Sequence, residues 1–177
     1  MIKKMMIIFL KPLSFLPALL MMSVIFGFSA QTGEVSGSLS YDVSYKVVEI
    51  GNKALNQDLE EWQIKEYASK IEHPLRKLAH MTEYFFLAVT VSFPLYVYGL
   101  RGVPLMLLTG LICVGFAAGD EYHQSFVAER SPSARDVVID SVGVFLGILA
   151  VRFVLFLCNF LSSGYFSDKK NTSKGCC

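Results

Sequence analysis

The hydrophobic positions of the chain gather into four long runs, at about 5–28, 78–98, 103–119 and 137–158. A helix needs roughly 20 mostly apolar residues to cross the hydrocarbon core of a bilayer. Inside a bilayer the backbone polar groups must bond within their own segment, so each crossing segment should be helical. The pattern therefore predicts an all-α protein, an integral membrane four-helix bundle. In the fourth run a Gly-x-x-x-Gly spacing also predicts close contact with another helix.

The polar segment between the first two runs has two parts. Residues 31–40 are rich in Ser, Gly and Thr and are typical of a flexible connection. In 52–71, Leu55, Leu59 and Trp62 recur near helical spacing, which predicts an amphipathic outer-loop segment. Such a helix can lie on the membrane surface with Trp62 at headgroup level, or it can be a solvated helix packed on a neighbour. The pattern leaves both readings open.

These segments divide the chain into four parts. We expect a first transmembrane helix in 1–30, an extracytoplasmic loop in 31–73, a three-helix core in 74–160 and a cytoplasmic tail in 161–177. The first helix is expected to stay as a signal anchor. The alternative is a cleaved signal peptide, which Phe28 disfavours because it is too large three residues before the best cleavage site.

Lysine and arginine in the short flanking segments predict the orientation. If all four runs cross, the N-terminal flank, the turn between runs two and three, and the tail lie on one side. That side should be the cytoplasm, so we expect a multi-pass protein of the plasma membrane with both termini inside. The basic residues that carry this prediction are Lys3, Lys4, Lys11, Arg101, Lys169, Lys170 and Lys174.

Composition agrees with a membrane protein. The 177 residues are 53% hydrophobic and only 18% charged, and the mean hydropathy is +0.47. The length suggests one domain, and a net charge of +1 gives no indication of nucleic acid as a partner. The expected partner is the lipid bilayer. The four cysteines have no metal-ligand spacing. We expect Cys176-Cys177 to be an inert tail, with lipid attachment or a disulfide as alternatives.

Ionisable residues border or enter the last three runs, where they are costly and therefore indicate function. At the start of the second run, Arg76, His80 and Glu83 share one helical face, with Lys77 and Tyr84 beside it.

A second polar set ends the third run and begins the fourth. Asp136 and Asp140 are one helical turn apart, so both can face the bundle centre. All the polar residues should then meet at one outer end of the bundle. The second set consists of Asp120, Glu121, Gln124, Arg130, Asp136 and Asp140.

The two sets resemble the motif blocks of the VanZ-like family in order and spacing. The first block is Lys77-Leu-Ala-His80-Met-Thr-Glu83-Tyr84, and the second runs from Asp120 to Asp136. The resemblance covers about 28–147. The family is named for a membrane protein associated with teicoplanin resistance, so the resemblance implies a small multi-helix membrane protein. It also implies a role in cell-envelope properties or low-level resistance to teicoplanin-type antibiotics. The chain departs from the family at Asp140, where an Asn is expected.

Three interpretations of the polar residues remain open. They can bind a ligand, catalyse a reaction on a lipid-linked envelope substrate, or form a structural ion-pair network. We expect binding of an anionic lipid, an envelope precursor or a lipoglycopeptide, with catalysis as the alternative. The acid–base candidates are His80, Glu83 and Glu121. The ligand-binding candidates are Arg76, Lys77, Tyr84, Asp120, Gln124, Arg130, Asp136 and Asp140.

Other chemistries have less support. A metal set of His80, Glu83, Glu121 and His123 is a further option, but it is disfavoured because on a helix His123 faces largely away from Glu121. We therefore expect neither a metal nor a cofactor. His73, before Pro74 in the outer loop, is expected to be solvated. A channel would need acidic groups near the midplane, and the sequence has none there.

Overall fold

A computed structural model describes the backbone of residues 11–172 and the side chains of residues 11–161. The predicted all-α architecture is confirmed, and the described residues contain no strand. Four of the helices are long and apolar enough to cross a membrane. In chain order the elements are the short 3₁₀-helix η1 (Pro12–Phe15), α2 (Leu16–Ser29), α3 (Gly33–Ala54), α4 (Glu61–Val97), α5 (Gly102–Gln124) and α6 (Ala134–Thr172).

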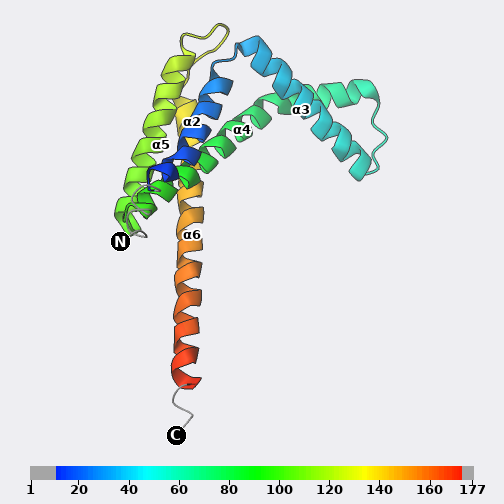
Figure 1. Cartoon of the computed structure of the whole chain (residues 1–177). Helices are drawn as coiled ribbons and strands as arrows, with labels where there is room; N and C mark the ends of the chain where they lie inside the picture. The colour runs from blue at the N-terminus through cyan, green and yellow to red at the C-terminus, as the bar shows by residue number, and fades with distance from the viewer. Residues whose placement is uncertain (1–10, 173–177) are drawn as a thin grey trace.

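Helix α4 is the centre of the structure, because it packs against α2, α3, α5 and α6. The core between these helices contains fully buried Ile25, Tyr84 and Leu87 and nearly fully buried Val144. Figure 1 shows α2, α4, α5 and the first part of α6 gathered together, while α6 runs on past them toward the C-terminus. The apolar residues that face outward are those a lipid-embedded bundle exposes.

The contact between α4 and α6 depends on two glycines one helical turn apart. A Cβ added at Gly143 would overlap the backbone oxygen of Met81, and one at Gly147 would lie 2.5 Å from the backbone oxygen of Phe85. Only residues without a side chain let the two helix backbones approach this closely. The close helix contact predicted from the Gly-x-x-x-Gly spacing is therefore confirmed.

The prediction of a flexible connection at 31–40 was wrong, because α3 begins at Gly33. Thr32 caps this helix by accepting a hydrogen bond from the backbone N–H of Val35 at 3.4 Å. Two of the small residues that suggested a linker instead contact α4: Gly37 lies against Arg76, and Oγ of Ser40 accepts a hydrogen bond from Nε of Arg76 at 3.1 Å.

The prediction of one helix over 52–71 is also wrong in its bounds. The segment is interrupted, because α3 ends at Ala54 and α4 begins at Glu61. A capping box at Glu60 and Gln63 fixes this start. With 37 residues, α4 is about 55 Å long, well beyond the hydrocarbon thickness of a bilayer. Its first half runs beside α3 away from the other helices (Figure 1). His73 and Pro74, expected in a loop, lie within α4.

Candidate functional site

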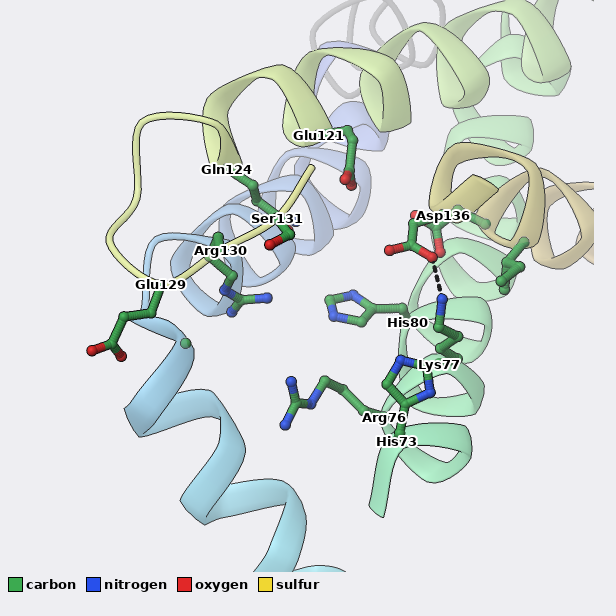
Figure 2. Close-up of a pocket in the computed structure, with 13 residues that line it drawn as sticks. His73, Arg76, Lys77, His80, Glu121, Gln124, Glu129, Arg130, Ser131 and Asp136 are labelled. Atoms are coloured by element: carbon green, nitrogen blue, oxygen red, sulfur yellow. Dashed lines mark hydrogen bonds and ion pairs between the residues drawn. The ribbon is translucent and has the colours of Figure 1, made fainter. Parts of the chain in front are cut away.

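A cavity of about 290 Å³ opens at the end of the bundle where the α5–α6 loop meets α3 and α4. Figure 2 shows its polar side chains entering from α4 on one side and from the α5–α6 connection on the other. Eight of the eleven predicted site residues line it. The lining residues are Gly33, His73, Arg76, Lys77, His80, Glu121, Gln124, Glu129, Arg130, Ser131, Asp136, Ile139 and Asp140.

Arg130 is anchored by the end of α2 and the turn after it. Its Nε donates to the backbone oxygen of Gln31 at 3.2 Å, and its Nη2 donates to that of Phe28 at 3.3 Å. Among the described residues no carboxylate forms an ion pair with Arg130. Burial, followed by the nearby charge of Arg76, lowers the pKa of the Arg130 guanidinium. The group nevertheless stays charged, because arginine does not lose its proton in proteins.

The α5–α6 loop is fastened to the start of α3 by backbone contacts. The N–H of Gly33 donates to the oxygen of Ala128 at 3.1 Å, and the N–H of Glu34 donates to Oε2 of Glu129 at 3.0 Å. A Cβ at Gly33 would overlap the backbone of Glu129, so this approach requires glycine. These contacts hold Arg130 over the cavity.

Helix α4 supplies the opposite wall. Arg76 forms an ion pair with Glu72, and its Nε donates to Oγ of Ser40 at 3.1 Å. Lys77 forms an ion pair with Asp136, which ties α4 to the start of α6. In Figure 2 the side chains of Arg76 and Arg130 extend toward the same space from its two sides.

His80 extends from α4 into the cavity toward Arg130 (Figure 2). Its Nδ1 lies 3.3 Å from Oε2 of Glu83, one turn further along α4. Oε2 of Glu83 is buried and has no hydrogen-bond partner of ordinary geometry among the described residues. Glu83 does not line the cavity, so it contacts the cavity only through the His80 imidazole.

Asp120 and Tyr84 lie behind the cavity in the core. Oδ2 of Asp120 accepts hydrogen bonds from Oγ of Ser29 at 2.6 Å and from Nε2 of Gln124 at 3.0 Å. Gln124 also donates to Oγ of Ser29 at 3.1 Å and lines the cavity. The Tyr84 hydroxyl and Oδ1 of Asp120 are buried without partners in the described structure. Ser29, absent from the predicted set, thus joins α2 to α5.

The other two carboxylates of the cavity differ in their contacts. Glu121 accepts a hydrogen bond from the backbone N–H of Ser133, which fixes the start of α6. Asp140 is only 7% exposed, and within the described part of the chain it makes neither a hydrogen bond nor an ion pair. Among the described residues, Asp140 is therefore the cavity carboxylate that has no hydrogen-bond or ion-pair partner.

The cavity includes residues that were not predicted. His73 is solvent-exposed, as expected, yet it also lines the cavity because α4 extends far enough to bring it one turn before Arg76 and Lys77. The other lining residues that were not predicted are Gly33, Glu129, Ser131 and Ile139.

The four residues considered for a metal set do not all meet at one place. His123 does not line the cavity, and its ring packs on Phe26 with centroids 4.3 Å apart. No group of three or more His, Cys, Asp or Glu residues within the described ranges is placed to hold a metal ion.

Comparison with known protein families identifies a relationship that covers most of the chain. The family model described as VanZ/LLP1 matches residues 14–157, most of the chain. No curated protein and no solved structure gives a significant match. The match covers the first helix, both polar sets and most of α6, and it confirms the resemblance carried by those sets. The chain belongs to the VanZ/LLP1 family.

Proposed function

We propose that the cavity binds an anionic envelope ligand at the outer face of the plasma membrane. The observation that carries the proposal is Arg130, a half-buried guanidinium over a cavity, held by backbone oxygens with no carboxylate ion pair in the described structure. A guanidinium in such a place favours a phosphate or carboxylate, because charge-assisted bonds are strong and often bidentate.

The neighbouring charges support an anion at this position. Arg76 extends toward the same space (Figure 2). Three of the cavity carboxylates already have partners: Asp136 pairs with Lys77, Glu121 accepts from Ser133, and Glu129 accepts from Glu34. The remaining one, Asp140, has no hydrogen bond or ion pair within the described part of the chain and can accept a hydrogen bond from a polar part of the same ligand.

The ligand class follows from the location of the cavity. It lies at one end of helices long enough to cross a bilayer, so a lipid headgroup, a lipid-linked precursor or a lipoglycopeptide can reach it from the membrane. Family membership supports a role in envelope properties or low-level resistance to teicoplanin-type antibiotics. A ligand held at this face would change the access of such an antibiotic to its target.

A membrane-embedded enzyme is the second candidate, and the contact between His80 and Glu83 favours it. A carboxylate 3.3 Å from Nδ1 can orient the imidazole and stabilise its protonated form, leaving Nε2 to exchange a proton with a substrate in the cavity. The substrate would be a lipid-linked envelope molecule whose anionic group is held by Arg130. Glu83 would be a positioning residue in this reaction, since it does not reach the cavity.

The first test compares teicoplanin susceptibility of cells that produce the wild-type chain, Arg130→Gln or Arg135→Gln. Arg135 is an exposed arginine a few residues away and provides the matched control. We expect the wild type and Arg135→Gln to raise the minimal inhibitory concentration equally. Arg130→Gln should return it to that of cells without the protein, while still accumulating in the membrane. Full resistance in Arg130→Gln cells would contradict the proposal.

The same strains separate binding from catalysis. Lipid and envelope-precursor profiles should be covalently unchanged if the cavity only binds its ligand. A new or missing covalent species in wild-type cells, lost in a His80→Asn variant, would instead support the enzyme.

A further inference from the structure

A second cavity, of about 350 Å³, lies at the opposite end of the bundle between α4, α5 and α6. Arg101, at the start of α5, and Arg152, in the apolar part of α6, both line it. Along α5, Arg101 and Glu121 are 20 residues apart, about 30 Å in a helix and close to the hydrocarbon thickness of a bilayer. If one cavity lies at headgroup level, the other therefore lies at the headgroup level of the opposite leaflet.

The charges at this end are of one sign. The helical segments that build it, 11–29, 84–119 and 141–161, contain no Asp or Glu. The cations there are Lys11, Arg101 and Arg152, and none of them forms an ion pair with a described residue. An uncompensated arginine beside apolar helices is costly. The anion that balances these charges must come from outside this part of the protein.

Arg101 is held in a fixed position. Its Cζ lies 3.4 Å from the ring centroid of Tyr96, and Nη1 donates to the backbone oxygens of Tyr96 and Leu100 at the end of α4. Stacking on the ring orients the guanidinium plane. Within the described structure, no hydrogen bond uses Nε or Nη2, so these nitrogens can donate to an anion.

An apolar groove of about 270 Å³ between α4 and α6 continues from this cavity. The two share four lining residues: Ser92, Tyr96, Val151 and Leu155. Beyond them the groove is lined by Val89, Phe93, Ala150 and Val154. A cationic cavity at the membrane boundary is thus continuous with an apolar groove that runs along the helices.

We propose that Arg101 and Arg152, together with this groove, form a binding site for one anionic phospholipid. The phosphate lies on the two guanidinium groups, and an acyl chain lies in the groove between α4 and α6. Basic pockets between membrane helices bind anionic headgroups in this way. The groove favours a lipid over free phosphate, because phosphate would leave the apolar walls unused. This site is separate from the first cavity and does not rest on the function proposed for it.

The test measures lipid binding to the full chain in a neutral detergent by native mass spectrometry. Dioleoylphosphatidylglycerol should bind more tightly than dioleoylphosphatidylcholine. Arg152→Gln should weaken phosphatidylglycerol binding by about fivefold or more, the change that corresponds to about 1 kcal/mol per basic side chain at an anionic surface. The control Arg135→Gln, at the other end of the molecule, should leave binding unchanged. The same measurements in an Arg130→Gln background show whether lipid bound in the first cavity contributes to the signal.

A matched pair of variants tests the apolar groove. Ala150→Phe places a ring in the groove and should weaken phosphatidylglycerol binding, whereas Leu149→Phe, on an exposed position of the same helix, should not. Equal affinity for the two lipids, or unchanged binding in Arg152→Gln, would overturn the proposal. Displacement of the lipid by inorganic phosphate at similar concentrations would overturn its assignment to a phospholipid.

Discussion

At the scale of single residues, the polar side chains divide into those that face the cavity and those that support it. Arg76, His80 and Arg130 extend into the cavity. Behind them, Asp120 holds α2 and α5 together through Ser29 and Gln124. A buried carboxylate that accepts two hydrogen bonds is expected to contribute to stability as well as to the shape of the site.

Replacing Asp120 by alanine should lower the free energy of unfolding by about 1–3 kcal/mol, because the buried Ser29 hydroxyl and Gln124 amide lose their acceptor. Asp42→Ala, at an exposed position of α3, is the matched control and should change stability little. Thermal unfolding in detergent, followed by intrinsic fluorescence, measures both. Equal stability of the two variants would contradict the supporting role of Asp120.

Helical spacing predicted part of this arrangement. It placed Arg76, His80 and Glu83 on one face, and two of them reach the cavity. Glu83 is one turn further into the bundle, where its carboxylate contacts His80 rather than open space. The anchoring of Arg130 could not be predicted, because its partners are backbone oxygens of residues about 100 positions earlier, which carry no side-chain signal.

At the scale of helices, small residues decide which elements meet. Gly143 and Gly147 bring α6 against the backbone of α4, and their spacing made that contact predictable. The Ser- and Gly-rich start of α3 has a similar role against α4, but its composition suggested a flexible linker. Composition alone does not separate the two cases, because small polar residues suit both a loop and a close helix contact.

Gly143→Ala should destabilise the protein by about 1–3 kcal/mol, the typical cost of overpacking, because the new methyl group meets the Met81 backbone. At Gly115, in α5, the methyl group of the same substitution would have no neighbouring atom within 4 Å. It should be neutral or stabilising by up to about 1 kcal/mol, since alanine favours helix more than glycine does. Thermal unfolding of the two variants in the same detergent checks the difference, and destabilisation by both changes alike would contradict the packing argument.

At the scale of the whole molecule, charge is distributed unequally along the bundle. The cavity beneath the α5–α6 loop contains both cations and carboxylates. The opposite end, where α4 turns into α5, has cations and no carboxylate in the segments that build it. Basic residues in short connections favour the cytoplasmic side. This asymmetry supports a cavity that opens outward and a lipid site that faces inward.

The function proposed for the cavity requires that it open to the outside of the cell. It is tested most directly by labelling a single cysteine at Ser131, which lines the cavity, in a chain whose four native cysteines are replaced by alanine. An impermeant thiol reagent should modify Ser131→Cys on intact cells, whereas Arg101→Cys should react only after the membrane is permeabilised. The reverse pattern would place the cavity in the cytoplasm and contradict its role at the outer face.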